Sequence, residues 1–185
     1  MTYVLSPHPD HRPTNVMSVR VRLGSGPGNF IMLTYIVEPA DSLKLPQHGD
    51  GRQDGLWHST CFEMFLKTLD GPGYREFNFA PPFAWNAYAF ADWRKGMKEL
   101  PLDDNPHLVD SRLDDRKTLF PARYELDVVL GSEVSSVLPA KLSLAAVIEE
   151  RSGAKSYWAL AHPPGKPDFH HPACFTAILP PIALA

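Results

Sequence analysis

Cysteine is scarce in this sequence. Only Cys61 and Cys174 occur among 185 residues, and neither belongs to a CxxC pair or to another metal-ligand spacing. Cys61 lies inside an apolar segment and Cys174 directly precedes Phe175. We therefore expect both to be small, buried hydrophobic residues. A disulfide between two outer strands is the alternative.

Long apolar runs are also absent. No segment approaches the ~20 apolar residues of a membrane span, and the first residues, MTYVLSPHPDHRP, lack the basic start and apolar core of a secretory signal. The formal net charge of −3 favours neither nucleic acid nor an anionic membrane surface. We therefore expect a cytoplasmic protein with neither as a partner.

Common catalytic motifs are missing as well. The sequence contains no Gly-x-Ser-x-Gly elbow, no phosphate-binding glycine loop and no HExxH motif. The frequent signatures of hydrolases, nucleotide-binding enzymes and metalloproteases are thus excluded. The sequence favours binding over catalysis.

Proline and glycine, by contrast, are abundant, with 19 and 12 residues. They favour short elements and frequent turns over long helices. About ten short, alternating apolar segments separated by turns predict an all-β protein with little helix. We expect one domain over residues 1–185, an antiparallel β-sandwich of jelly-roll or immunoglobulin-like type.

Several segments carry this prediction. Residues 15–23 alternate, with Met17, Val19, Val21 and Leu23 on the inner face, whereas residues 30–37 are apolar on both faces, as in a central strand covered on both sides. Residues 119–130 alternate most clearly, and 107–113 and 174–179 are further strands.

Residues 142–149 and 156–161 predict a hairpin, and residues 131–140 a single helical turn. Residues 85–93 fit a strand better than a helix, because two prolines directly precede them.

The most informative stretch is a hairpin formed by residues 61–69 and 74–80 around the turn Asp70-Gly71-Pro72-Gly73. Alternation places Phe62, Met64 and Leu66 on one face and Glu63 on the other, where Glu76 and Asn78 follow from the second strand. Two interpretations are open. This polar face is either the wet outer side of a half-buried sheet or the floor of a ligand site.

The loop of residues 41–55 leads into this hairpin and is rich in Gly, Asp and Pro. A loop of this length in a compact domain is either mobile or functional. Arg52 and His58 lie beside Trp57 in the sequence. We expect them at the rim of a pocket, although a polar surface loop is the alternative.

Sequence motifs extend this argument. LWHSTCFEMFL, YREFNFAPP and WNAYAF resemble the DOMON-like β-sandwich family, which is related to sugar-binding modules. SYWALAHPPGKPDFHH resembles the closing signature of one bacterial branch of that family. The resemblance spans most of the chain and implies the fold, the inclusion of Arg52 in the site, and haem or sugar as the ligand.

Sugar binding fits these residues. Pyranose rings stack on aromatic side chains, and their hydroxyls bond to carboxylates, amides and guanidinium groups. The candidate ligand-binding residues are Arg52, Trp57, His58, Glu63, Glu76, Asn78, Trp85, Tyr88, Trp158 and His162. The expected function is non-catalytic binding of a small molecule, most directly a carbohydrate.

Other functions stay open. Haem or metal binding for electron transfer could use Met64 or Met97 with His162, but the spacing defines no such pair. His162, Asp168, His170 and His171 carry metal-ligand chemistry, yet adjacent histidines on an extended chain point in opposite directions, so no metal is expected. Glu63 and Glu76 could also form the carboxyl pair of a glycosidase.

Overall fold

The computed structural model describes residues 1–25, 30–113 and 122–181 and is almost entirely β-structure. The strands are β1 Thr2–Pro7, β2 Ser18–Ser25, β3 Ile31–Glu38, β4 Gly51–Arg52, β5 Cys61–Thr68, β6 Tyr74–Ala80, β7 Ala84–Phe90, β8 Lys98–Glu99, β9 His107–Leu113, β10 Arg123–Leu130, β11 Ala140–Glu149, β12 Lys155–Ala159 and β13 Ala177–Leu179. One helical turn, α1 Ser132–Ser135, and two 3₁₀ turns, η2 Leu56–His58 and η3 Pro172–Cys174, accompany them. The all-β prediction is confirmed.

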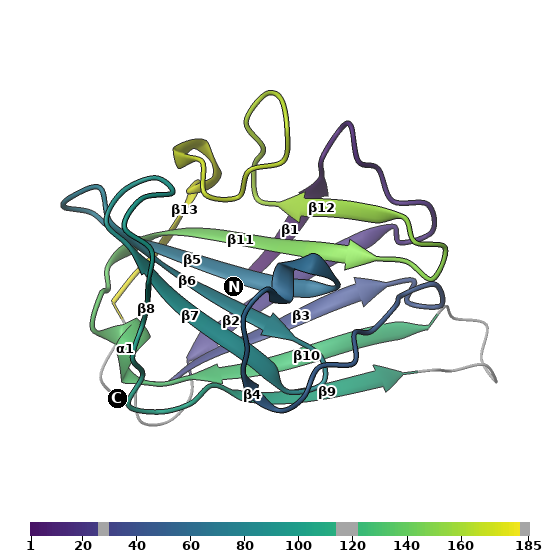
Figure 1. The fold of residues 1–185 in the computed structure, drawn as a ribbon, viewed down its shortest axis with the longest axis horizontal. Helices are drawn as coiled ribbons and strands as arrows, with labels where there is room; N and C mark the ends of the chain where they lie inside the picture. The colour runs from purple at the N-terminus through teal and green to yellow at the C-terminus, as the bar shows by residue number, and fades with distance from the viewer. Residues whose placement is uncertain (26–29, 114–121, 182–185) are drawn as a thin grey trace.

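The described strands form one curled sheet. Its main path runs β4-β7-β6-β5-β11-β12-β1-β2-β3-β10-β9, with β8 beside β7 and β13 beside β11 (Figure 1). β1 joins the two halves, because Thr2 to Leu5 pair with β2 while Ser6 and Pro7 pair with β12. β4 and β7 are parallel. The predicted sandwich of ten antiparallel strands is therefore not confirmed, since the sheet is continuous and mixed.

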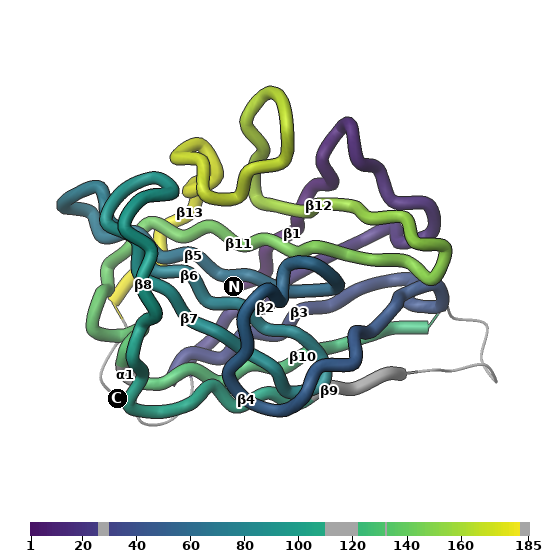
Figure 2. Tube along the Cα trace, viewed as in Figure 1, coloured from purple at the N-terminus to yellow at the C-terminus, as the bar shows by residue number. Residues whose placement is uncertain are grey.

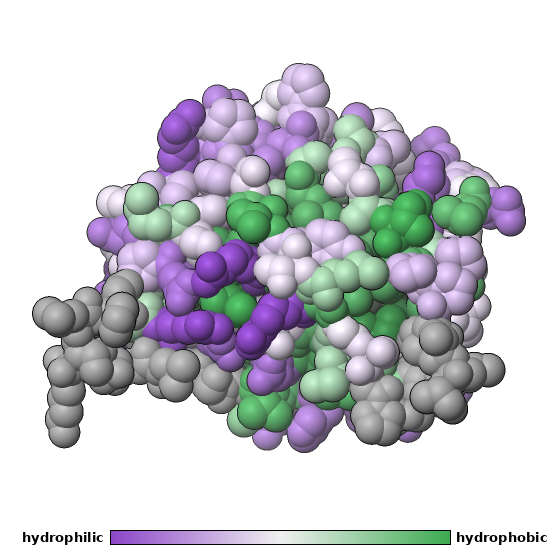
Figure 3. All heavy atoms as spheres, turned by 180° about the vertical axis from the view of Figure 1, so that it is seen from behind, coloured by the Kyte–Doolittle hydropathy of each residue, from purple (hydrophilic) through white to green (hydrophobic). Residues whose placement is uncertain are grey.

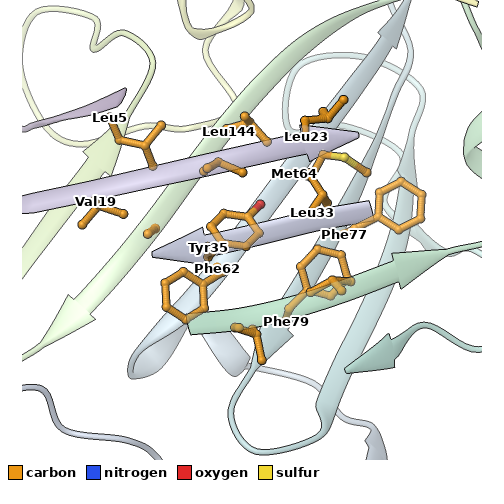
Figure 4. Close-up of a cluster of buried hydrophobic side chains, with 14 of the residues drawn as sticks. Leu5, Val19, Leu23, Leu33, Tyr35, Phe62, Met64, Phe77, Phe79 and Leu144 are labelled. Atoms are coloured by element: carbon orange, nitrogen blue, oxygen red, sulfur yellow. The ribbon is translucent and has the colours of Figure 1, made fainter. Parts of the chain in front are cut away.

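The main core lies between the two halves of this sheet. Figure 4 shows Phe62, Met64, Phe77 and Phe79 from β5 and β6 facing side chains of β2 and β3 such as Tyr35. The Tyr35 hydroxyl donates a 2.9 Å hydrogen bond to the Glu63 carbonyl and so links the halves. This position of the apolar face follows from alternation along each strand.

The predicted strands are largely present, with local differences. In β2, Val19, Val21 and Leu23 are buried as predicted, but Met17 precedes the strand and is 77% exposed. β3 is covered on both sides only in part, because Ile36 is buried on its second face whereas Met32 is exposed there. β10 has the predicted alternation over the part that is described, whereas residues 119–121 of that prediction lie outside the described residues.

The outer face of β2, β3 and β10 is polar. Arg20 forms an ion pair with Glu38, and Arg22 Nη2 lies 3.4 Å from Glu125 Oε2. The view from behind shows strongly hydrophilic side chains among apolar ones (Figure 3). Exposed ion pairs of this kind contribute little stability, ~0–1 kcal/mol each. This half of the sheet therefore has one apolar and one wet face.

The other half of the sheet is different, because segments outside the strands cover its second face. β5 is buried from Cys61 to Leu66, and the even-numbered residues of β6 and β7 are buried as well. A second apolar cluster fills part of this covered face and comprises Phe65, Tyr74, Tyr88, Phe90, Ala145, Val147, Ala159 and Phe169. The hairpin face that carries Glu63 is therefore not a wet surface.

Both cysteines are buried and free, as the sequence predicted. Cys61 lies in β5 and Cys174 in η3. Within the residues that the structure describes, no helix has the length and apolar composition of a membrane span.

Candidate functional site

A cavity of about 450 Å³ lies on the covered face. β5 and β6 form its floor, and its walls come from η2, the segment after β7, β11, β12 and the segment after β12. In Figure 2 the segments after β7 (teal) and after β12 (yellow) lie near each other at the upper left, and η2 lies in front of the sheet (Figure 1). The lining residues are Trp57, His58, Glu63, Glu76, Phe90, Arg94, Met97, Val147, Lys155, Tyr157, Pro167, Phe169 and His170.

The floor carries two buried carboxyl groups. Glu63 is 3% exposed and Glu76 is 4% exposed. Glu63 is paired in register with Asn78, and Phe65 with Glu76, so the two glutamates are diagonal neighbours on one face. Asn78 Nδ2 donates a 2.7 Å hydrogen bond to Glu76 Oε1. Glu63 Oε1, although buried, accepts no hydrogen bond from the described residues.

Burial changes the protonation of these groups. Burial and the Glu76 carboxyl raise the pKa of Glu63 well above its ordinary value, against an opposing effect of Arg94. Burial raises the pKa of Glu76 to about 7, while the Asn78 hydrogen bond and the Arg94 charge act to lower it. Glu76 therefore holds its proton up to about pH 7.

His170 closes the floor beside Glu76. Burial and the Arg94 charge lower the pKa of His170 to about 4, with Asp168 acting in the opposite direction, so the imidazole is neutral at pH 7. The Tyr74 hydroxyl accepts from the Arg94 N–H at 3.3 Å and can donate to His170 Nδ1 at 2.7 Å. That arrangement leaves the imidazole N–H on Nε2, 3.8 Å from Glu76 Oε2. The contact is thus between neutral histidine and the carboxyl pair.

The cationic side chains of the wall already have partners. Arg94 Nε and Nη2 lie 3.0 and 2.6 Å from Asp168 Oδ1, and Trp93 Nε1 donates to Asp168 Oδ2 at 3.2 Å. Arg94 has φ 54°, in the left-handed region that few non-glycine residues adopt. Lys155 Nζ donates a 2.6 Å hydrogen bond to the His58 carbonyl. The local structure therefore fixes both cations at the rim.

Aromatic side chains form much of the remaining wall. Trp57 is 37% exposed and its ring centroid lies 6.2 Å from that of Tyr88. Tyr157 and Phe169 have ring centroids 6.2 Å apart, and Phe90 stacks on Tyr74 at 4.7 Å. A flat apolar ring face can therefore meet an indole or phenol face inside a cavity that also offers carboxyl oxygens.

The structure brings together part of the predicted site. Trp57, His58, Glu63 and Glu76 line the cavity, and Asn78 lies beneath it, bonded to Glu76.

Two predicted residues lie in a neighbouring network. The Tyr88 hydroxyl donates to Asp54 Oδ1 at 2.6 Å, and Arg52 Nη1 donates to Asn86 Oδ1 at 2.9 Å. Arg52 also stacks over Trp85, with 4.4 Å between Cζ and the ring centroid. These contacts hold residues 52–54 against β7 behind Trp57 and so support the rim.

The remaining three predicted residues lie away from the cavity. Trp85 and Trp158 belong to the main core on the opposite face, 4% and 2% exposed, because their positions in β7 and β12 have the parity of the inner face. Trp158 satisfies its indole N–H by a 2.9 Å bond to Ser156 Oγ. His162 Nε2 lies 2.8 Å from the Ser6 carbonyl, beside His8 and away from the carboxyl pair.

Several lining residues were not predicted. Val147 pairs with both Cys61 and Tyr157, which brings β11 and β12 alongside the predicted hairpin. Val147 and Tyr157 lie opposite the core face of their strands, and the pairing of β5 with β11 brings them to this site. Phe90, Arg94, Met97, Lys155, Pro167, Phe169 and His170 complete the set that sequence reasoning missed.

The residues considered as candidate metal and haem ligands do not converge. In the described part of the chain, no group of three or more His, Cys, Asp or Glu is arranged to hold a metal ion. Asp168 is bonded to Arg94, and His171 accepts from the Ala173 N–H at the start of η3. Met64 lies in the main core and Met97 at the cavity rim, neither in a common site with His162. The residues present therefore do not fit an axial haem pair.

Fold and site together define an all-β protein with a covered cavity of the size that small molecules occupy, ~300–1,000 Å³. No family model matches the chain, and no curated protein matches it. Among solved structures, it is similar to a crystal structure of a "putative carbohydrate-binding protein" from Bacteroides uniformis ATCC 8492. The TM-score is 0.64 and the sequence identity 16%, over 95% of this chain and 84% of that chain. At this identity the likeness shows a shared fold.

Proposed function

We propose that this protein is a DOMON-like domain that binds a small carbohydrate, without catalysis, in the cavity above β5 and β6. The observation that carries the proposal is Glu63 Oε1, which is buried at the cavity floor and accepts no hydrogen bond from the described residues. A buried polar atom of this kind costs ~1–3 kcal/mol unless a partner arrives. A ligand hydroxyl is a suitable donor.

The surroundings support a sugar over a purely apolar ligand. Trp57 and Tyr157 offer ring faces, while Glu63, Glu76 and the His170 N–H offer both acceptors and a donor. A pyranose presents the same combination of C–H faces and hydroxyls. The volume of about 450 Å³ lies near the lower end of small-molecule pockets, which suits one or two sugar rings better than a polysaccharide chain.

The fold is shared with the Bacteroides uniformis protein, and that protein's description supports carbohydrate as the ligand class. The motif LWHSTCFEMFL, which led to the DOMON-like assignment, supplies Trp57, His58 and Glu63 of the cavity. These two lines of support are independent of the cavity's chemistry.

Isothermal titration of the full chain with monosaccharides and disaccharides tests the proposal. We expect saturable binding by the wild type and a loss of about tenfold in affinity for Glu63→Ala, because one hydrogen bond at the cavity floor is removed. Asp70→Ala, which removes an exposed carboxylate outside the cavity, is the control and should bind normally. Absence of binding across the panel would refute the proposal.

A second candidate, glycoside hydrolysis, is favoured by one observation. Two carboxyl groups share the floor, and a pKa of about 7 at Glu76 suits a general acid. Release of reducing sugar from a panel of glycans separates the two functions. The binding proposal predicts no release above the level of a Glu76→Gln variant.

A further inference from the structure

The cavity floor carries two carboxyl groups that no cationic side chain of the described residues neutralises in an ion pair. Glu63 and Glu76 face the cavity from β5 and β6, and among the described residues neither has an Arg or Lys nitrogen in an ion pair with it. Arg94 is bound to Asp168, and Lys155 donates to the His58 carbonyl. The nearest basic nitrogen is His170 Nε2, 3.8 Å from Glu76 Oε2.

Two hydrogen-bond acceptors at the cavity floor also lack a donor among the described residues. Glu63 Oε1 and Asn78 Oδ1 are both buried acceptors without a donor among the described residues. They belong to register-paired positions of adjacent strands, with Glu76 as the diagonal neighbour of Glu63. Three acceptor groups therefore lie on neighbouring positions of one sheet face, and among the described residues no Arg or Lys forms an ion pair with either glutamate. Hydroxyls can satisfy acceptors, but only a cation also offsets their charge.

From this geometry we infer that the preferred ligand is an amino sugar, whose protonated amine lies against Glu63 and Glu76 while its ring stacks on the aromatic wall. The inference rests on the proposed carbohydrate function and narrows its ligand class. An ammonium group has three N–H donors and no acceptor, which matches a floor composed of acceptors. Acetylation of the amine removes both the charge and two of these donors, so the N-acetyl sugar lacks what the floor requires.

The protonation of the two glutamates provides a second test for an amine ligand. The amine cation favours the ionised form of the carboxyl pair, so ligand binding releases protons held by Glu63 and Glu76. Lowering the pH from about 7.5 to 5.5 crosses the Glu76 pKa of about 7, so Glu76 becomes protonated and amine binding weakens. The other charged or titratable groups at the cavity are Arg94, Lys155, His58 and His170, and the last is neutral throughout this interval.

The test compares matched ligands on the full chain by isothermal titration at pH 7.5. Glucosamine, galactosamine and mannosamine are each titrated beside the corresponding neutral hexose and N-acetyl derivative. We expect at least one amine to bind about tenfold or more tightly than both of its partners, since charge-assisted hydrogen bonds are roughly twice as strong as neutral ones. The preference should shrink at pH 5.5.

Glu63→Gln tests whether the preference arises at the floor. This variant keeps the shape of the side chain and should reduce the amine-to-hexose affinity ratio to below about threefold. Asp70→Asn makes the same charge change at an exposed position outside the cavity and should keep the wild-type ratio. Thermal melting verifies that both variants are folded. Glu76→Gln provides a second arm if Glu63→Gln does not fold, and it should likewise reduce the ratio.

The outcomes are distinct. Neutral or N-acetyl sugars that bind as tightly as the amines overturn this inference and leave carbohydrate binding intact. Failure of every sugar overturns the proposed function and this inference with it. Cyclohexylamine that binds as tightly as glucosamine shows an amine site without sugar recognition and also overturns the inference.

Discussion

Glu63 of β5 and Asn78 of β6 are register partners on the one face of the sheet that other segments cover. The Glu63 carboxyl reaches the cavity, whereas Asn78 Nδ2 donates to Glu76 Oε1. An ordinary half-buried sheet would expose such a pair to water. Here both side chains are buried, so the folded structure determines the protonation of Glu63 and the hydrogen bonds of Asn78.

The first prediction concerns pH and stability. Glu76 has a pKa of about 7 in the folded protein against an ordinary value of 4.5, so the folded state binds more protons between these values. The free energy of unfolding is therefore highest below about pH 4.5 with respect to this group and falls as the pH rises through about 7. The fall amounts to about 3 kcal/mol for such a shift.

Urea denaturation of the ligand-free protein at pH 5.0 and 7.5 measures this effect. Glu76→Gln should be less sensitive to pH than the wild type and more stable at pH 7.5, because the amide needs no proton. Glu99→Gln should follow the wild-type curve, since this carboxylate is 65% exposed. A stability that rises from pH 5.0 to 7.5 in the wild type but not in Glu76→Gln would contradict the assignment.

The second prediction concerns the main core. Leu126 in β10 is fully buried and pairs in register with Tyr35 of β3. Leu126→Ala should lower the free energy of unfolding by ~2–5 kcal/mol, the usual cost of a buried cavity. Met32→Ala, at an exposed position of the neighbouring strand β3, should change it by no more than ~0.5 kcal/mol. Equal effects of the two substitutions would mean that the core face is misassigned.

Sequence alone predicted this core because strand alternation is local. Val19, Val21 and Leu126 are buried as their positions indicated, and the hairpin of β5 and β6 has its predicted partners. The position of Met17 could not be predicted equally well, because alternation does not show where a strand begins. The burial of Glu63 could not be predicted either, because it depends on residues 162–170, about a hundred positions away in the chain.

The third prediction separates two tryptophans that the sequence does not distinguish. Trp57 lies at the cavity rim, and Trp85 lies in the main core. Trp57→Ala should abolish measurable sugar binding with a stability loss below about 1 kcal/mol, because much of this side chain is already exposed. Trp85→Ala should cost ~3–5 kcal/mol. Denaturant unfolding beside sugar titration distinguishes these cases, and a Trp57 variant with unchanged affinity would count against the aromatic wall.

The two tryptophans illustrate what cannot be predicted from the sequence alone. Proximity in the chain placed Trp57 and Trp85 together beside the hairpin, but alternation along β7 sends Trp85 with Phe79 to the core face. Lys155 and Tyr157 come from a distant hairpin whose pairing partner is not evident from local pattern. A covered cavity built from such segments requires the tertiary pairing to be known.

The fourth prediction concerns the thiols. Burial and neighbouring carboxylates raise the pKa of Cys61 above its usual range, and burial with the Asp168 charge raises the pKa of Cys174 to about 11. Since the thiolate is the reactive form, neither residue should be labelled by a thiol-specific disulfide reagent in the native protein at pH 7.5. Two thiols should react at once in denaturant. Rapid labelling of one thiol in the native state would contradict its burial.

The most direct test of the central claim is a crystal structure of the protein with a bound sugar. The account predicts electron density for the sugar ring within the cavity against Trp57 or Tyr157, with a ligand donor at hydrogen-bond distance from Glu63 Oε1. Sugar bound at another surface, with Glu63 Oε1 still lacking a ligand partner, would contradict it.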